Sequence, residues 1–311
     1  METRKIGSLD VSVIGLGTNN FGFSMEEADV PPVVDAALEA GINMFDTADS
    51  YGQSEQRLAK ALGTRRDDVV VATKFASPLG ADRPGGARPE YVRSAIERSL
   101  RELATDRIDL YQIHRPDPDT PIADTLGALD ELVKAGKVRE IGCSNFSAGQ
   151  LVEAEEAVKA GAARFVSVQN HYNLLHRADE AEVLPTCEKL GIAHIPFFPL
   201  ASGLLTGKYR RGEAPPDGTR LAAWGDRASR MLSDQNFDVV ERLDDWAQQR
   251  GHTVLELAFA WLLAKPTVAS VIAGATKVEQ VRANAAVRWR LTPEEVAEVD
   301  ALAAGGPAEA T

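Results

Sequence analysis

Short apolar runs rich in β-branched residues alternate along this chain with longer segments whose apolar residues recur three or four positions apart. The first pattern is typical of buried β-strands and the second of amphipathic helices. Strand-like runs occupy residues 12–17, 42–46, 69–74, 108–114, 138–145, 165–170, 192–198 and 268–274. Helical segments follow the first six, at residues 32–41, 54–63, 88–103, 121–136, 147–161 and 179–191. Most of these helical segments end on glycine, which accepts the left-handed dihedrals of a helix C-cap.

Alternating strands and helices predict repeated βα units with parallel strands, and eight such strands close a barrel. We therefore expect an α/β fold, a (β/α)8 TIM barrel with extended loops on its C-terminal face. A doubly wound open sheet is the competing architecture, because periodicity alone does not separate the two.

Three further segments lie outside this repeat. Residues 3–12 predict an N-terminal β-hairpin that could plug the bottom of the barrel. Residues 200–235 form a long connection rich in Gly, Pro and Arg, of the kind that often serves as a lid. Residues 236–265 predict two helices before the last strand.

The length of 311 residues suits one barrel with loop extensions, since such a barrel needs about 250 residues. Without a linker or a break in composition, we expect one domain over residues 1–311, with a core at about 3–300 and a frayed tail at 301–311.

Charge and cysteine content narrow the function classes. The net charge of −12 disfavours nucleic-acid and membrane-surface partners, because both are anionic. The chain shows neither a signal-peptide pattern nor an apolar run of membrane-spanning length, and its two cysteines lack C-x-x-C spacing. We therefore expect a cytoplasmic protein with a small-molecule substrate.

Its five histidines show no H-E-x-x-H pattern, and no Cys/His cluster predicts a metal site.

Polar side chains stand at the ends of successive predicted strands, where a barrel carries its function. Asp46 and Tyr51 follow the second strand, Lys74 ends the third and His114 ends the fourth. Singly, each is more often a helix cap, a surface charge or a hydrogen-bonded core residue. Together they are expected to lie close to one another, because the carboxyl ends of the strands meet at the barrel mouth.

The chemistry of these four residue types is specific. A phenol has an ordinary pKa of about 10, and a nearby ammonium lowers that value by favouring the phenolate. Lys74 could act on Tyr51 in this way if Asp46 holds the lysine charged. His114 could donate a hydrogen bond to a carbonyl oxygen. This set suits protonation of an oxygen that gains charge, as when hydride adds to a carbonyl.

The segments FDTADSYGQSE, VATKF, LYQIHRPDP, GCSNF and FPLASGLLTGKY resemble the aldo-keto reductase superfamily, in order, from about residue 3 to about residue 300. The resemblance implies the barrel fold and the catalytic tetrad Asp46, Tyr51, Lys74 and His114. The channel-associated β subunits of the same superfamily usually carry Asn where this chain has His114, which favours a working reductase.

The resemblance also implies an NADP(H) molecule extended across the barrel mouth, whereas the sequence GLGTNNFG fails the Rossmann pattern G-x-G-x-x-G. By family match, Gly17, Thr18 and Asn19 lie near the nicotinamide ribose, and Ser144, Asn145 and Gln169 bind the carboxamide. Phe197 stacks on the nicotinamide ring, and Asp46 also contacts the cofactor. The pyrophosphate loop, its clasp and the adenosine segment are matched by Pro199, Leu200, Ala201, Ser202, Gly203, Leu205, Lys208, Arg220, Gly274, Thr276, Lys277, Gln280 and Asn284.

Several questions stay open at this level. Many family members have Arg where Gln280 stands, so NADP(H) is expected and NADH is the less favoured cofactor. The expected activity is NAD(P)H-dependent reduction of an aldehyde or ketone to an alcohol, with Tyr51 as proton donor. The alternatives are an NADP(H)-binding regulatory protein with little turnover and a barrel enzyme of another chemistry, such as a lyase. The physiological substrate and the oligomeric state are not determined by the sequence.

Overall fold

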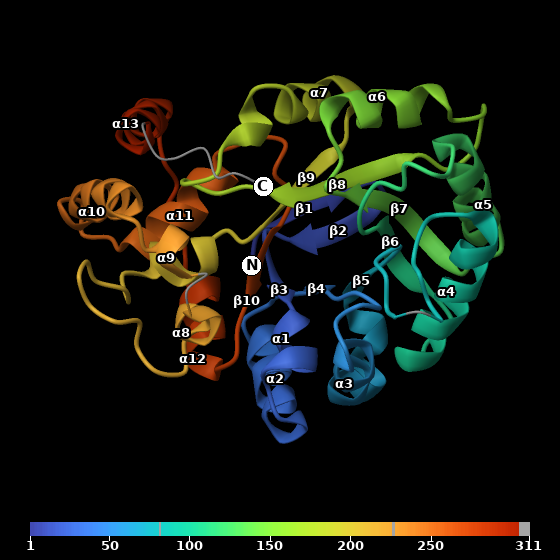
Figure 1. The fold of residues 1–311 in the computed structure, drawn as a ribbon, viewed down its shortest axis with the longest axis horizontal. Helices are drawn as coiled ribbons and strands as arrows, with labels where there is room; N and C mark the ends of the chain where they lie inside the picture. Colours follow the sequence, from blue (N-terminus) through green and yellow to red (C-terminus); the bar gives the residue numbers. More distant parts are fainter. Residues whose placement is uncertain (81, 226–227, 305–311) are drawn as a thin grey trace.

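The computed structural model describes residues 1–80, 82–225 and 228–304, and its centre is a barrel of eight parallel strands (Figure 1). The strands lie in the order β10-β3-β4-β5-β6-β7-β8-β9. The ring closes between β9 and the segment before β10, where His194 N donates to Thr267 O (2.8 Å) and Ala269 N donates to His194 O (3.0 Å). The barrel that the sequence predicts is confirmed, and the open-sheet alternative is wrong. The barrel strands are β3 (Ile14–Gly17), β4 (Met44–Asp46), β5 (Val70–Phe75), β6 (Ile108–Ile113), β7 (Val138–Ser144), β8 (Phe165–His171), β9 (Ala193–Phe197) and β10 (Val271–Gly274).

Helices surround this ring on its outer side (Figure 1). They lie at α1 (Asn19–Phe23), α2 (Val30–Glu39), α3 (Ser54–Leu62), α4 (Pro89–Glu102), α5 (Ile122–Lys134), α6 (Ala148–Glu156), α7 (Val183–Leu190), α8 (Arg220–Trp224), α9 (Ala228–Met231), α10 (Asp234–Gln248), α11 (Val254–Leu263), α12 (Val278–Ala285) and α13 (Pro293–Ala303). Short 3-10 helices lie at η1 (Glu27–Asp29), η2 (Gly63–Asp68), η3 (Ala178–Glu180) and η4 (Ala201–Thr206). Most of these helices bury an apolar stripe against the strands or a neighbouring helix, whereas α10 packs between α11 and α13. The largest apolar core therefore lies between the barrel and the helices.

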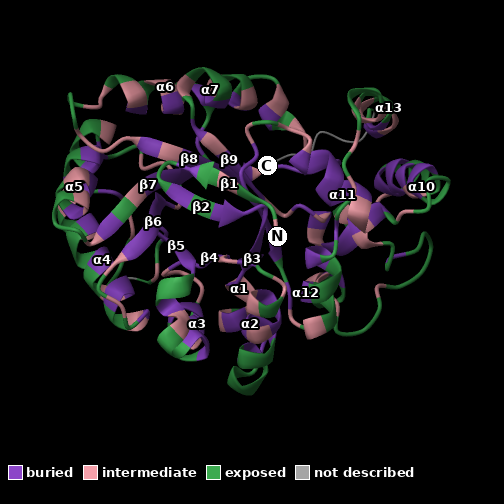
Figure 2. Cartoon of the chain, turned by 180° about the vertical axis from the view of Figure 1, so that it is seen from behind, coloured by how far each residue is buried: buried purple, intermediate pink, exposed green. Residues whose placement is uncertain are grey.

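The N-terminal hairpin covers one end of the barrel. β1 (Thr3–Ile6) and β2 (Leu9–Ser12) pair antiparallel, as predicted, and lie across the strands when the molecule is seen from behind (Figure 2). Ile6, Leu9 and Val11 are buried with apolar side chains of the barrel interior such as Met44 and Leu110. The hairpin therefore closes the amino-terminal end of the ring, which leaves the carboxyl end for a site.

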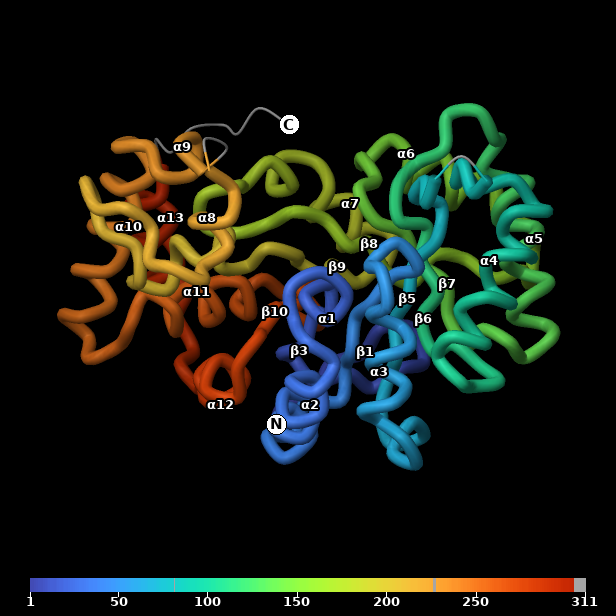
Figure 3. Tube along the Cα trace, turned by 60° about the horizontal axis from the view of Figure 1, so that its bottom comes forward, coloured from blue at the N-terminus to red at the C-terminus, as the bar shows by residue number. Residues whose placement is uncertain are grey.

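Some predicted boundaries are wrong. The helix expected at 147–161 ends at Glu156, and Gly161, with φ of 76°, stands in a separate turn that redirects the chain toward β8. The strand expected at 268–274 begins only at Val271. The connection 200–235 contains η4, α8 and α9, and the last two lie on the side of the molecule opposite the N-terminus (Figure 3). The predicted frayed tail falls largely on residues 305–311, which are outside the described residues.

Within the described residues, no helix combines the length and the apolar character that a membrane crossing requires.

Candidate active site

Three neighbouring strands bring the predicted tetrad together. Asp46 ends β4, Lys74 lies near the end of β5, and His114 directly follows β6. Tyr51 stands in the loop that joins β4 to α3. Because these strands are adjacent and parallel, their carboxyl ends meet at one side of the barrel mouth, so the structure places all four side chains in one cluster.

A buried ion pair forms the base of this cluster. Lys74 Nζ donates to Asp46 Oδ2 at 2.7 Å and to the backbone oxygen of Thr47 at 2.8 Å, and the Lys74 side chain is fully buried. The other carboxylate oxygen of Asp46 accepts from Gln169 Nε2 at 2.9 Å. Asp46 therefore has partners on both oxygens, one from β5 and one from β8, which holds it in a single orientation.

This pairing keeps the lysine charged. Burial by itself lowers the pKa of Lys74, but the charges of Asp46 and Tyr51 act in the opposite direction, and the pKa of Lys74 lies above its ordinary value. A lysine without such a partner would lose its proton in so dry a place. The protein thus maintains a permanent positive charge beneath Tyr51.

The phenol of Tyr51 lies over this charge, with Lys74 Nζ 5.1 Å from the centroid of the ring. The sequence predicts that Lys74 makes Tyr51 more acidic than an ordinary tyrosine, and this prediction is wrong. Burial raises the pKa of Tyr51 above its ordinary value, and the Lys74 charge only reduces that increase. At neutral pH the phenol therefore carries its proton, which is the form a proton donor needs.

His114 is held beside Tyr51 as a neutral ring. The two rings meet edge to face with centroids 5.6 Å apart, and Ser50 Oγ lies 3.3 Å from His114 Nδ1. Burial, together with the charges of Lys74 and Arg115, lowers the pKa of His114 to about 3. A neutral imidazole with a hydroxyl at one nitrogen can donate from the other nitrogen to a carbonyl oxygen.

The loop that carries Tyr51 is clamped by a close backbone contact that the sequence analysis missed. A Cβ added to Gly22 would lie 1.6 Å from the carbonyl oxygen of Tyr51, so only glycine fits there. Gly52, with φ of 58°, packs against the backbone of Gly22 from the other side. The sequence FGF around Gly22 gives no sign of this contact, because the partner lies 29 residues further along the chain.

The residues predicted to contact a cofactor occupy the other side of the mouth, formed by β7 to β10 and β3. Ser144 Oγ donates to the backbone oxygen of Gln169 at 2.6 Å, and Asn145, with φ of 61°, donates to Ser144 Oγ at 3.1 Å. Asn170, next to Gln169, has a buried side-chain oxygen without a hydrogen-bond partner. These amide and hydroxyl groups gather at the ends of two adjacent strands, where together they offer donors and acceptors.

An irregular loop continues from β9. Phe197 ends the strand half-buried, and its ring stacks on His171 with centroids 5.5 Å apart. Phe198, Ala201, Ser202 and Gly203 all have positive φ, so the backbone here is coiled tightly. The ammonium of exposed Lys208 lies against Gly203, where a Cβ would meet it at 2.6 Å. Pro199, Leu200 and Leu205 belong to the same loop, and Leu205 is fully buried.

Arg220 and the segment after β10 lie further along the same side. Arg220 Nη2 donates to Asn20 Oδ1 at 3.1 Å, which ties α8 to α1. Gly274 is exposed at the end of β10, and Lys277 is exposed at the start of α12. Gln280 Oε1 accepts from the backbone N–H of Thr276 at 2.8 Å, so that N–H already has a partner within the protein. Asn284 is buried within α12.

Two of the predicted cofactor residues use their side chains for the fold. The Thr18 hydroxyl is fully buried, donating to the backbone oxygen of Asp46 at 2.9 Å and lying 2.8 Å from Ser54 Oγ. The side chain of Leu205 belongs to the apolar core. Only their backbone atoms remain for a ligand, whereas Gly17 and Asn19 adjoin Thr18 at the mouth.

A sequence model of the aldo/keto reductase family matches residues 13–304. The chain belongs to the aldo/keto reductase family. The resemblance drawn from the sequence motifs is thereby confirmed, and membership supports an oxidoreductase that acts on small carbonyl compounds.

Three relatives of this aldo/keto reductase carry different names. It is 37% identical over 289 residues to a protein of Bacillus subtilis (strain 168) named "Uncharacterized oxidoreductase YrpG", covering 88% of this chain and 86% of the relative. It is 31% identical to "L-glyceraldehyde 3-phosphate reductase" of Escherichia coli (strain K12), covering 96% and 90%. It is 34% identical to "Probable voltage-gated potassium channel subunit beta" of Oryza sativa subsp. japonica, covering 99% and 98%.

The described part of this aldo/keto reductase contains no group of three or more His, Cys, Asp or Glu side chains placed to hold a metal ion.

Proposed function

We propose that this protein reduces an aldehyde or ketone to an alcohol with NADP(H), and that Tyr51 donates the proton. The observation that carries the proposal is the buried chain of contacts from Gln169 through Asp46 to Lys74, which ends beneath the phenol of Tyr51. The barrel fold does not by itself require a fully buried lysine that points at a tyrosine at its mouth.

The cluster can stabilise the charge that develops on a carbonyl oxygen. When bound, the nicotinamide supplies a hydride to the carbonyl carbon. Neutral His114 orients the carbonyl oxygen by hydrogen bonding, and Tyr51 gives that oxygen its proton. Lys74 stabilises the phenolate that remains, and Asp46 keeps Lys74 charged through the exchange. Because the pKa of Tyr51 is raised, the phenol carries its proton at neutral pH and can donate it.

The groups on the β7–β10 side suit a dinucleotide phosphate. A half-buried aromatic face at Phe197, and Ser144 and Asn145 nearby, fit a flat ring that carries an amide. Lys208, Arg220 and Lys277 form no ion pair with an acidic side chain among the described residues, although the protein as a whole is strongly acidic. Unpaired cations beside a coiled backbone loop are what phosphate groups bind. Lys208 and Arg220 match the pyrophosphate loop and its clasp, which suit NADH equally well, whereas Lys277 matches the adenosine segment, where only NADP(H) carries a further phosphate. We propose NADP(H) over NADH on the strength of Lys277.

Substitution of Tyr51 by Phe tests the assignment. The ring and its packing remain, so we expect the dissociation constant for NADPH to change by less than about threefold. The rate of reduction of an aromatic aldehyde should fall by about 10³-fold, because a positioned acid contributes about 10²–10⁴-fold. Turnover is followed by NADPH absorbance and binding by NADPH fluorescence.

Tyr91→Phe is the matched control, since Tyr91 lies on α4 away from the tetrad and its hydroxyl interacts with Arg98. This control should turn over at the wild-type rate. If Tyr51→Phe kept more than about a tenth of the activity, the proton donor would be another group.

The kinship with a protein named as a potassium channel subunit favours one alternative, an NADP(H)-binding regulatory protein with little turnover. That alternative predicts tight NADPH binding without oxidation of NADPH on any member of a carbonyl panel. The presence of neutral His114 within reach of Tyr51 supports the reductase instead.

A further inference from the structure

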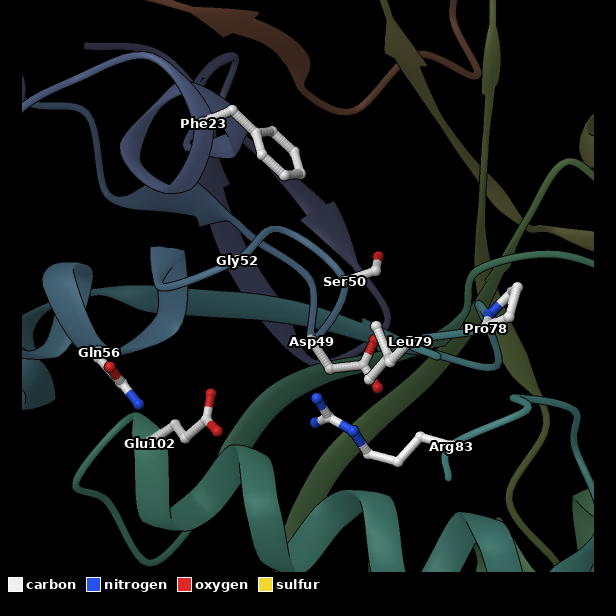
Figure 4. Close-up of a pocket in the computed structure, with 9 residues that line it drawn as sticks. All are labelled: Phe23, Asp49, Ser50, Gly52, Gln56, Pro78, Leu79, Arg83 and Glu102. Carbon is white, nitrogen blue, oxygen red and sulfur yellow. The ribbon is translucent and has the colours of Figure 1, made fainter. Parts of the chain in front are cut away.

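The loop 47–52, which carries Tyr51, continues beside β5 after β4 has ended. Asp49 N donates to Lys74 O at 3.1 Å, so the backbone is fixed to β5 as far as Asp49. One flank of the loop borders a cavity of about 410 Å³, which is lined by the residues on both sides of Tyr51 and by the segment after β5 (Figure 4). On that flank the loop lacks packed neighbours, so its position there depends on other contacts.

The side chain of Asp49 is buried behind this loop without a hydrogen-bond partner. It is only 4% exposed, and both carboxylate oxygens are buried and unpartnered, so they do not face the cavity. A carboxylate in such a place loses its hydration without compensation. Burial accordingly raises the pKa of Asp49 to about 7. The ionised side chain therefore lowers the stability of the fold, which makes its presence beside Tyr51 significant.

Arg98 on α4 approaches this carboxylate from the outer side of the barrel. Its Nη2 lies 3.8 Å from Asp49 Oδ2, which is too far for a hydrogen bond but close enough for attraction between the two charges. The guanidinium lies 5.6 Å from the centroid of the Tyr91 ring, on the same helix. Because α4 packs on α3 and β5, this attraction joins the loop to a helix that is fixed on the barrel.

Several other titratable groups surround Asp49. They come from α3, α4, β5, β6 and the segment after β5, and they are Glu55, Tyr91, Glu102, Lys74, Tyr111 and Arg83. After the effect of burial, the cations lower the pKa of Asp49 and Glu102 raises it. Burial also raises the pKa of Glu55 to about 7. A change of charge near neutral pH therefore has two candidate carboxyl groups, which variants must separate.

We propose that Asp49 is a positioning residue whose ionised carboxylate, attracted to Arg98 on α4, holds the loop 47–52 in place. The loop in turn sets Tyr51 beside His114. The proposal rests on the proposed function, because it concerns the position of the proposed proton donor. A buried charge that destabilises the fold is retained, on this account, because it fixes the flank of the loop that the cavity leaves without packing.

Asp49→Asn tests the role of the charge, because it keeps the size of the side chain. At pH 8 we expect kcat for an aromatic aldehyde to fall by about tenfold, less than the about 100-fold that a full 1 Å displacement costs. KM should stay within about twofold, since the contact acts on the reaction step. The urea midpoint at pH 8 should rise, because the variant no longer buries a charge.

Asp109→Asn is the matched control, since Asp109 is a fully buried carboxylate on β6 that has close partners. It lies 2.8 Å from Arg66 Nη1 and 2.9 Å from Arg139 Nη1, and it accepts from Val71 N at 3.0 Å. Loss of this pairing should lower the urea midpoint, while kcat stays within about twofold. The two variants should therefore shift the midpoint in opposite directions, which separates a positioning carboxylate from one that supports the fold.

A double-mutant cycle tests the partner. Arg98→Met removes the cation and keeps the aliphatic stem, so it should lower kcat to about the level of Asp49→Asn. The double variant should fall no further, because both changes remove the same attraction. Arg93→Met is the control on the exposed surface of α4, where Arg93 pairs with Glu131, and it should leave kcat unchanged.

The pH dependence gives a further readout. Since the pKa of Asp49 is raised from 3.8 to about 7, kcat of the wild type should fall as the pH falls through about 7. The folded protein keeps a proton here that the unfolded chain has already lost, so the gain in stability of Asp49→Asn should grow as the pH rises from about 4 to 7. The decrease in kcat near pH 7 should persist in Glu55→Gln and be absent from Asp49→Asn.

Amide hydrogen exchange follows the loop without any turnover. In the full-length protein without cofactor at pH 8, protection of the amides at residues 47–52 should be about tenfold lower in Asp49→Asn than in the wild type. Below about pH 6 the wild type should approach the protection of the variant, because Asp49 is then protonated. Amides of α5 should exchange equally in both proteins.

The outcomes keep this inference separate from the proposed function. A raised urea midpoint together with lower kcat and lower loop protection would support it. Unchanged loop protection in Asp49→Asn would overturn it, as would a lowered midpoint like that of Asp109→Asn or additive losses in the double variant. Lower loop protection with unchanged kcat would overturn the link to Tyr51. If even the wild type reduced no carbonyl, the proposed function would fail, whereas loop protection would still decide whether Asp49 holds the loop.

Discussion

The two sides of the barrel mouth are built differently. On the β4–β6 side, Asp46 and Lys74 are buried and bonded to each other, and Tyr51 and His114 pack directly above them. On the β9–β10 side, Lys208 and Lys277 are exposed on an irregular loop and a short helix. The first side is therefore held together by contacts within the protein, whereas Lys208 and Lys277 on the second side form no ion pair with an acidic side chain among the described residues. A reaction centre needs fixed geometry, and a site for a large exchanging cofactor needs free groups.

The largest effect is expected when the buried ion pair of the first side is broken. In Lys74→Met, the Asp46 carboxylate stays buried without its cation, so the free energy of unfolding should fall by about 3–5 kcal/mol. Urea denaturation measures this change. Lys5→Met is the control, because Lys5 pairs with Asp10 at the same distance of 2.7 Å on the surface. The control should change stability by less than about 1 kcal/mol. An equal decrease in the free energy of unfolding of the two variants would contradict the difference between the buried and the exposed ion pair.

An intermediate effect is expected where α1 meets the Tyr51 loop. Gly22→Ala places a Cβ where the Tyr51 carbonyl oxygen stands, so the loop must move and Tyr51 must shift from His114 and Lys74. A displacement of about 1 Å costs about 100-fold in kcat. The aldehyde assay should show this fall in kcat with a smaller change in KM.

Gly127→Ala provides the comparison, because Gly127 lies within α5 and an added Cβ meets no heavy atom within 4 Å. That variant should keep its activity and gain up to about 1 kcal/mol of stability from better helix propensity. An unchanged kcat in Gly22→Ala would show that the loop adapts.

The smallest effect concerns the second side. Arg220→Ala removes the hydrogen bond to Asn20 that joins α8 to α1, and removes a cation proposed to hold the cofactor. We expect the dissociation constant for NADPH to rise by about tenfold, with the free energy of unfolding unchanged within about 0.5 kcal/mol. Fluorescence titration and urea denaturation provide the two measurements.

Arg211→Ala is matched to it, since Arg211 lies on the same connection and its exposed ion pairs are with Asp234, Asp238 and Glu241. That change should leave NADPH binding unaltered. Comparable weakening by the two variants would mean that general positive charge, rather than the clasp at Arg220, governs binding.

The contacts at the site differ in how far the sequence could predict them. Asp46, Lys74 and His114 each follow from a strand-end position, because parallel neighbours in a barrel must bring those positions together. The direction of the Tyr51 pKa did not follow, since it depends on how completely the ring is buried. The contact made by Gln280 did not follow from the sequence either. Its side chain accepts a hydrogen bond from the backbone N–H of Thr276, in the turn just before α12.

Elements were predicted well where one local period dominates and poorly where neighbours decide. The strands at 108–114 and 165–170 appear nearly as expected, because β-branched and other apolar residues recur at short intervals along both runs. The five-residue helix α1 was missed, since it is held by contacts with the Tyr51 loop rather than by its own sequence. The helix at 147–161 was drawn too long because Gly161 resembles a C-cap.

The amino-acid order by itself determined the alternation of strands and helices, the barrel, and which chemical groups stand at the strand ends, because these depend on periodicity and on the parallel arrangement it implies. Only the tertiary structure decided that Gly22 clamps Tyr51 and that His114 stays neutral. Those features depend on burial and on distances between segments far apart in the chain, which no local pattern records.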